Sequence, residues 1–115
     1  MKSWNLLEYE VEPHKPQVLG TTAEGRAVVV SLDAGDSMAD HQVRERATLV
    51  TVAGEIEILA EDRETITVST GTLVVFEPGE RHSLLAREDS RFLLLLSPWS
   101  LDQHSSMEPW SRDAS

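Results

Sequence analysis

The amino-acid sequence predicts an all-β domain that closes as a barrel or a sandwich. Short runs of β-branched and aromatic residues recur at intervals of roughly 8–12 residues, separated by turns that contain glycine or proline. No stretch shows a helical period of useful length. The chain has 115 residues, enough for one domain that hides roughly two-thirds of its unfolded surface. A hydrophobic core is therefore sufficient to stabilise it.

The first 24 residues are expected to hold one short edge strand and a loop. Apolar residues alternate weakly from Trp4 to Val11, and Pro13 and Pro16 then interrupt the segment. This strand could pair with a partner subunit. Residues 25–32 predict a second strand, which is apolar on both of its faces. Such a strand needs a covering layer on each side.

The later strands are predicted from the alternation of polar and apolar residues and from the turn residues between them. Glutamate and isoleucine alternate in residues 55–58, and threonine alternates with isoleucine and valine in residues 65–68. These two segments predict a hairpin with one wet face. Pro78-Gly79 marks a tight turn between two more strands. The expected extended segments after residue 36 are 37–43, 47–53, 55–58, 65–68, 73–76, 83–87 and 91–97.

The last residues of the sequence have a different character. Residues 100–115 contain serine, aspartate and proline without a period, which predicts a polar C-terminal tail. Trp110 in this tail either covers the outside of the barrel or is unpacked. These boundaries divide the chain into an N-terminal strand and loop (residues 1–24), a barrel (residues 25–99) and a tail (residues 100–115).

The composition excludes several classes of function. The sequence has no cysteine, so it cannot form a disulfide, a thiolate metal site or a cysteine nucleophile. Its formal charge of −10 disfavours binding to nucleic acid or to an anionic membrane. The longest apolar run, residues 92–96, is too short to cross a bilayer, and the first residues lack the apolar core of a signal peptide. We therefore expect a cytoplasmic protein.

Two histidines stand near strand ends, each after a turn. Alternate residues of a strand face the same side, so Val43 and Glu45 share a face with His41, and Leu84 shares a face with His82. If the histidines point inward, they lie in a mostly apolar interior. A neutral imidazole there can orient a carbonyl or a carboxylate, or move a proton near neutral pH.

The spacing of glycines and histidines resembles that of the cupin superfamily over residues 25–97. The first cupin motif has glycine, five residues, His-x-His, three or four residues, glutamate, six residues and glycine. The second has glycine, five residues, Pro-x-Gly, two residues, histidine, three residues and asparagine. The residues in register with these motifs are Gly35, His41, Gly54, Gly71, Gly79 and His82. The resemblance implies a double-stranded β-helix, a jelly-roll-like barrel.

The sequence departs from the cupin motifs at the metal ligands. The resemblance implies a divalent metal held by two histidines and a glutamate from the first motif and a histidine from the second. Val43 replaces the second histidine, and Ala47 replaces the glutamate. A site for a first-row metal normally needs three or more protein ligands. His41, His82 and Glu45 together could restore that number, or Glu45 could instead be solvated at a charged corner of the chain.

Three functions remain open, and the sequence does not decide whether the protein is an enzyme. The first is binding of a small organic molecule with little or no metal. The second is a metal-dependent enzyme, of the oxygenase or isomerase type, in which His41, His82 and Glu45 hold Mn, Fe, Ni or Zn. The third is metal-free acid–base catalysis by the two histidines, which could also be purely structural. The expected pocket residues are His41, Val43, Ala47, His82 and Leu84.

The partner expected from the sequence is a second copy of the same chain. The apolar runs 27–30 and 92–96 offer more surface for burial than one small barrel needs. Packing of such faces against each other predicts a homodimer.

Overall fold

The computed structural model describes residues 1–41, 44–61 and 63–98, without the side chains of residues 39–41. The described residues contain no helix, and therefore none that could span a membrane. Their strands are β1 (Gln17–Thr22), β2 (Gly25–Leu32), β3 (Ser37–His41), β4 (Arg46–Ala53), β5 (Glu55–Ala60), β6 (Thr65–Ser69), β7 (Leu73–Phe76), β8 (His82–Ala86) and β9 (Ser90–Ser97). The predicted all-β class is confirmed. The expected tail and the pocket position Val43 lie outside the described residues.

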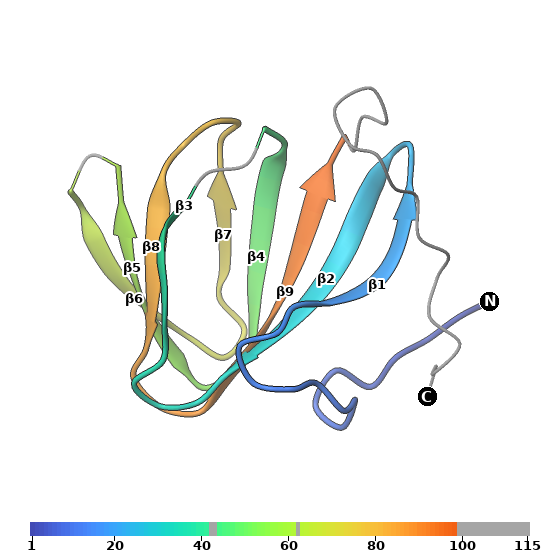
Figure 1. Ribbon diagram of the computed structural model, residues 1–115, viewed down its shortest axis with the longest axis horizontal. Coiled ribbons are helices and arrows are strands. Elements are labelled where there is room, and N and C mark those ends of the chain that lie inside the picture. The colour runs from blue at the N-terminus through green and yellow to red at the C-terminus, as the bar shows by residue number, and fades with distance from the viewer. Residues whose placement is uncertain (42–43, 62, 99–115) are drawn as a thin grey trace.

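The strands form two antiparallel sheets that face each other (Figure 1). Sheet A has the order β1-β2-β9-β4-β7, and sheet B has the order β3-β8-β5-β6. The β1–β2, β5–β6 and β7–β8 turns lie at one end of the barrel, together with the end of β3 and the start of β4 (Figure 1). We call this end the mouth. Residues that are distant in sequence therefore meet there.

Side chains that point inward from both sheets form one apolar core. Every second residue of β4 and of β8 is buried, which is the alternation expected for strands with one covered face. Ile66 departs from the predicted pattern. It pairs with Ile58 but stays 39% exposed, because β6 is the edge strand of sheet B. The buried core residues are Val28, Val30, Leu32, Ala47, Leu49, Ile56, Ile58, Val68, Phe76, Leu84, Ala86, Phe92 and Leu96.

The outer side of β2 is covered by the chain itself. Ala27 and Val29 are buried, and with Leu19 they form a second apolar cluster. The residues packed on this cluster are Trp4, Leu6, Tyr9, Val11 and Leu93. Residues 1–16, which we call the N-terminal segment, therefore supply most of the second covering layer that the sequence required. The edge strand expected between residues 4 and 11 is wrong, because the first strand begins only at Gln17.

One arginine holds the N-terminal segment in place. The Arg91 guanidinium donates hydrogen bonds to the backbone carbonyls of Leu6, at 2.8 Å, and Tyr9, at 2.5 Å. Both carbonyls belong to a segment without strand pairing of its own, since only an isolated bridge joins Pro13 to Ser31. Apolar packing and a side chain more than 80 residues away therefore help to hold the segment, together with the His14 N–H, which donates to the Ser31 carbonyl at 2.7 Å.

At the end opposite the mouth, β4 turns into β5 at Gly54, which has a φ of 92°. The turn packs directly against the start of β9. The Ser90 hydroxyl accepts the Glu55 N–H at 3.1 Å and lies 2.7 Å from the Glu88 carbonyl, to which it donates. Because β5 belongs to sheet B and β9 to sheet A, this contact ties the two sheets together.

Candidate functional site

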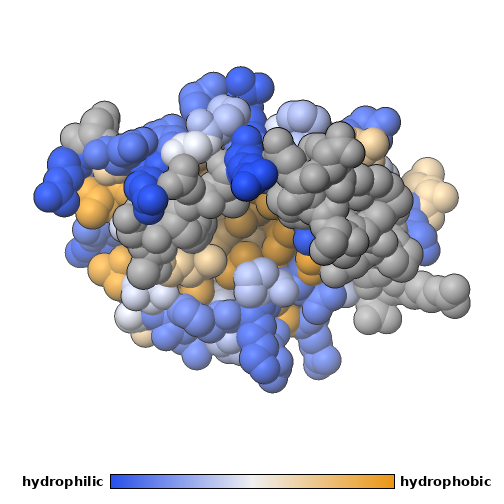
Figure 2. All heavy atoms as spheres, turned by 45° about the horizontal axis from the view of Figure 1, so that its top comes forward, coloured by the Kyte–Doolittle hydropathy of each residue, from blue (hydrophilic) through white to orange (hydrophobic). Residues whose placement is uncertain are grey.

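The residues that were predicted from the sequence to form a binding site lie at the mouth. His41 ends β3, Ala47 lies near the start of β4, and His82 begins β8 directly after the turn that contains Pro78 and Gly79. Figure 2 shows this end of the molecule tilted toward the viewer. Apolar residues gather in a hollow at the centre of this face, between polar residues above and below it. The mouth therefore offers an apolar depression with a polar edge.

His82 is buried at this end, with 4% of its surface exposed. Its ring stacks on Phe76, with centroids 3.8 Å apart and planes 7° from parallel. Its Nδ1 lies 3.3 Å from the Glu80 carbonyl oxygen. A carbonyl can only accept, so Nδ1 is the donor in this hydrogen bond. The stack and the hydrogen bond together hold the orientation of the imidazole.

The strand β8 behaves as its alternation predicts. Leu84 and Ala86 are buried with His82, whereas Ser83 and Leu85 are more exposed. Leu84 belongs to the barrel core, and so does Ala47 from the predicted pocket set. The Phe76 ring that stacks on His82 comes from β7, where Phe76 is the cross-strand partner of Ala47. These residues are thus close to one another inside the mouth.

Glu45 is buried, with 3% of its surface exposed, although its neighbours Arg44 and Arg46 are exposed. The expectation that Glu45 is solvated is therefore wrong. It continues the buried row of Ala47 and Leu49, which alternates along β4 toward the mouth. One step of two residues in a strand is about 6.6 Å. Glu45 therefore lies at the mouth end of the row that passes Phe76 and His82.

Arg46 is held by a different partner. Its guanidinium donates two hydrogen bonds of 3.1 Å to the carboxylate of Glu77, at the end of β7. These hydrogen bonds, and secondarily the positive charge, hold the pKa of the Glu77 carboxyl below its usual value. The same contact raises the pKa of Arg46. The pair is exposed, so it closes the outer edge of the mouth between β4 and β7 and contributes little to stability.

The backbone of His41 is the direct cross-strand partner of His82. This register places the two predicted histidines side by side on neighbouring strands. The described residues contain no group of three or more histidine, aspartate or glutamate side chains that could hold a metal ion. The side chain of His41 lies outside the described part of the structure. The metal site of His41, His82 and Glu45 therefore stays a prediction, in which the side chains of His82 and Glu45 are buried.

A cavity of about 280 Å³ lies at the rim of sheet B, between the β5–β6 turn and the start of β8. The cross-strand pair Leu59 and Ser83 lines it from the outer face of the sheet, opposite to the face on which the His82 ring is buried. The lining residues of the cavity are Leu59, Ala60, Glu61, Arg63, Arg81, His82 and Ser83. Two arginines and one glutamate give it a local positive charge on a protein of net charge −10. Arg63 and Phe76 were not selected from the sequence. The expected barrel topology could have pointed to Arg63, because alternate hairpin turns of a closed barrel lie at the same end.

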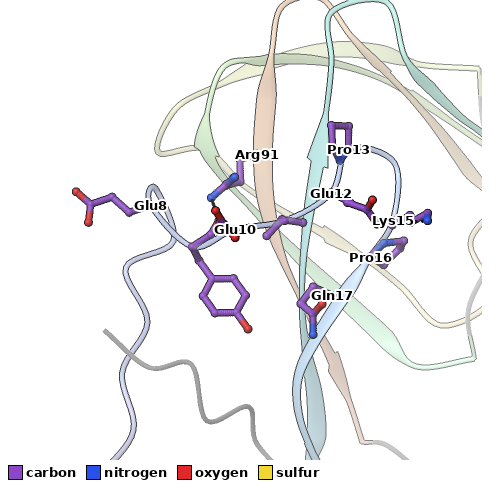
Figure 3. A pocket seen from close by; sticks show the side chains of 10 residues that line it. Glu8, Glu10, Glu12, Pro13, Lys15, Pro16, Gln17 and Arg91 are labelled. Atoms are coloured by element: carbon purple, nitrogen blue, oxygen red, sulfur yellow. Dashed lines mark hydrogen bonds and ion pairs between the residues drawn. The ribbon is translucent and has the colours of Figure 1, made fainter.

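A larger hollow, of about 720 Å³, lies under the N-terminal segment at the other side of the molecule (Figure 3). Three of its lining side chains are carboxylates, of which Glu8 extends away from the hollow (Figure 3). Arg91, one of its two cationic residues, already binds backbone carbonyls. This hollow separates a loop from the sheet, and it lacks the converging polar groups of a binding site.

Comparison with known proteins identifies the family. The sequence matches the Cupin domain family over residues 28–98, which is more than half of the chain. No curated protein matches it.

Solved structures agree with this assignment. An RmlC-like cupin protein from Desulfovibrio desulfuricans is similar with a TM-score of 0.77 and 22% identity, over 85% of this chain and 97% of that chain. KdgF from Halomonas sp. has a TM-score of 0.73 and 24% identity, over 90% and 98% of the two chains. SPY1581, a protein of unknown function from Streptococcus pyogenes, has a TM-score of 0.64 and 26% identity, over 87% and 97%. The chain therefore belongs to the cupin-domain family and has the double-stranded β-helix fold that the resemblance implied.

Proposed function

We propose that the mouth of the barrel binds a small organic molecule that carries a carboxylate and a hydroxyl or carbonyl group. The observation that supports this most directly is His82, a buried imidazole at the mouth whose ring stacks on Phe76 and contacts the Glu80 carbonyl, and which borders a cavity of about 280 Å³ at the rim of sheet B. An imidazole has two ring nitrogens that donate or accept according to the tautomer, so it can orient a hydroxyl or a carbonyl group of a ligand.

The cavity defines the size and charge of the ligand. Its volume lies just below the range of about 300–1,000 Å³ that is usual for drug-sized ligands, so the ligand is a small metabolite. The guanidinium groups of Arg63 and Arg81 in the lining favour an anionic group, because arginine pairs with a carboxylate through two parallel hydrogen bonds. The apolar Leu59 and Ala60 leave room for a short carbon chain.

The test is binding of a panel of small hydroxy- and oxo-carboxylates, measured by thermal shift and then by calorimetry. A ligand present at about 100 times its Kd stabilises the folded state by about 2.7 kcal/mol, which gives a clear rise in the melting temperature. His82→Gln is expected to weaken binding at least about tenfold, the effect of one lost polar contact. His14→Gln changes an exposed histidine far from the mouth and is the matched control. Binding that survives His82→Gln, or a panel without a single binder, contradicts the proposal.

A second candidate is a divalent metal held by His41, His82 and Glu45. The burial of Glu45 favours it, because the inward-facing row of β4 directs this carboxylate to the same end of the barrel as His82. His82 also fits, since metal-binding histidines usually donate their other ring N–H to a carbonyl or carboxylate. Two histidines and one carboxylate suit Fe²⁺ and related ions, which would supply Lewis-acid or redox chemistry.

Elemental analysis and titration with Mn²⁺, Fe²⁺, Ni²⁺ and Zn²⁺ separate the two candidates. Stoichiometric metal that is lost in Glu45→Gln and retained in Glu24→Gln, an exposed control, supports the metal site. Ligand binding that is indifferent to chelators and to Glu45→Gln supports the metal-free site. An activity lost in His82→Gln but unaffected by chelators would indicate acid–base catalysis by the imidazole.

A further inference from the structure

A second hollow adjoins the cavity at the rim of sheet B. It has a volume of about 400 Å³ and lies on the outer face of the sheet, where residues of β3, β8 and β5 line it. The cross-strand pair Leu59 and Ser83 lines both hollows. We call the hollow of about 400 Å³ the outer groove. It begins beside the arginine-lined cavity and extends toward β3, an edge strand of sheet B.

Two exposed leucines form the apolar wall of the outer groove. Leu59 is 37% exposed and Leu85 is 38% exposed, and each lies at an outward-facing position of its strand. They are diagonal neighbours, because Leu59 pairs with Ser83 and Leu85 follows Ser83 by two residues. Diagonal neighbours on one face of a sheet are about 7–8 Å apart, within reach of long side chains. Both leucines can therefore contact the same ligand.

The two ends of this surface differ in charge. At the rim, Arg63 and Arg81 line the cavity together with one carboxylate, that of Glu61. Farther along, Glu57 lines the outer groove, and the Arg87 guanidinium donates a hydrogen bond to its carboxylate. An ion pair of this kind compensates the charge of Glu57. The surface therefore has a positive end at the rim and an apolar trough beside it.

We propose that the ligand is an aliphatic carboxylate whose head group occupies the cavity and whose hydrocarbon chain lies along the outer groove. This inference rests on the proposed function, from which it takes the position of the carboxylate on Arg63 and Arg81. It adds that the chain is recognised on the outside of the barrel, by Leu59 and Leu85. A purely polar acid would leave both leucines in water, and a neutral hydrocarbon would leave the arginines without an anion.

The spacing of the strands sets the length of chain that the outer groove can hold. The path from the Leu59–Ser83 pair to the pair of Leu85 with Ser37 on β3 covers two residues along β8 and one strand spacing. Two residues correspond to about 6.6 Å and one spacing to about 4.8 Å, so the diagonal is about 8 Å. A chain longer than this passes the edge of the sheet and gains no further apolar contact.

Calorimetry with straight-chain 2-hydroxycarboxylates of about three to about ten carbons tests this dependence, because each buried methylene group tightens binding up to about fourfold. The groove is open on one side, so the expected gain is about two- to fourfold in Kd for each added carbon, followed by a plateau. A primary amine with the same chain is the control ligand. It carries the opposite charge and should bind much more weakly than the acid.

Leu85→Thr removes part of the apolar wall and should abolish most of the dependence on chain length, while the shortest acid binds as before. Leu73→Thr is the matched control, because Leu73 is a 57% exposed leucine on the outer face of sheet A, and the dependence should persist in this variant. Circular dichroism checks that each variant is folded. Leu59→Thr, on the other strand of the groove, replaces Leu85→Thr if that variant is not.

The possible results separate this inference from the function on which it rests. If no acid of any length binds, both are wrong. If the short acid binds and affinity does not change with chain length, the proposed function stands and the outer groove is not part of the site. A chain-length dependence that survives in Leu85→Thr and in Leu59→Thr, or an amine that binds as tightly as the acid, also overturns the inference.

Discussion

Replacing Gly54 by alanine tests how tightly the two sheets are joined at the end opposite the mouth. A Cβ atom on Gly54 would lie 2.5 Å from the Asp89 carbonyl oxygen and 2.7 Å from the Ser90 Cα, and it would also overlap the Ser90 hydroxyl. Real Cβ atoms essentially never approach other heavy atoms within 3.0 Å. Two of these three atoms belong to the backbone, so rotation of a side chain cannot remove the overlap.

Two costs add up at this position. The φ of 92° is a conformation that L-residues rarely adopt, at about 1–3 kcal/mol. Overpacking against a rigid neighbour adds about 1–3 kcal/mol. Alanine also restricts the unfolded chain, which recovers about 0.4–1 kcal/mol. The net loss should be about 3 kcal/mol, together with weakening of the Ser90–Glu55 hydrogen bond that links the sheets.

Gly35 provides the matched control, because its φ is 90° and nothing lies within 4 Å of the Cβ that alanine would add. Gly35→Ala should therefore cost only the conformational part, about 1 kcal/mol net. Urea denaturation at equilibrium, read by circular dichroism, measures both variants. A difference of about 2 kcal/mol between them corresponds to roughly 8 °C or more in the melting temperature. Equal losses for Gly54→Ala and Gly35→Ala would refute the close approach of this turn to β9.

Two further predictions concern single arginines. Arg91→Ala should lower the free energy of unfolding by about 2 kcal/mol and speed amide hydrogen exchange in the N-terminal segment, because the Leu6 and Tyr9 carbonyls lose a charged donor. Unchanged exchange there would contradict the anchoring role. Arg46→Gln should raise the pKa of Glu77, followed by NMR titration of its carboxyl carbon. Since that pKa is lowered in the fold, the pair stabilises above the unfolded-state pKa and loses its effect as the pH falls through the folded value.

Much of the fold was predictable because the pattern of apolar residues in a strand shows how many of its faces are covered. The alternating glutamates and isoleucines of β5 indicate one covered face, and the apolar run of β2 indicates two. The topology followed from the resemblance of the motif residues, such as Gly54 and His82, to the cupin superfamily, which implied the double-stranded β-helix. Family membership confirmed this step.

The features that were missed depend on contacts between distant segments. The N-terminal segment has no clear period, and its position on β2 is set by Arg91 and by apolar packing rather than by strand pairing. Glu45 lies between two arginines, a context that predicts exposure to solvent. Its side chain is nevertheless buried, on the same face of the chain as Ala47 in β4. Arg63 joins the cavity beside His82 only because two hairpin turns share one end of the barrel. Local sequence does not carry that information.

The separation of the two ends of the barrel has a consequence for how such a protein changes over time. At the opposite end from the mouth, the two sheets are joined at the Gly54 turn, which leaves no space for a single added methyl group. The mouth, by contrast, holds the apolar depression that Figure 2 shows at its centre. Substitutions there can alter what the protein recognises while the scaffold keeps its shape, so new ligands can be acquired without a new architecture.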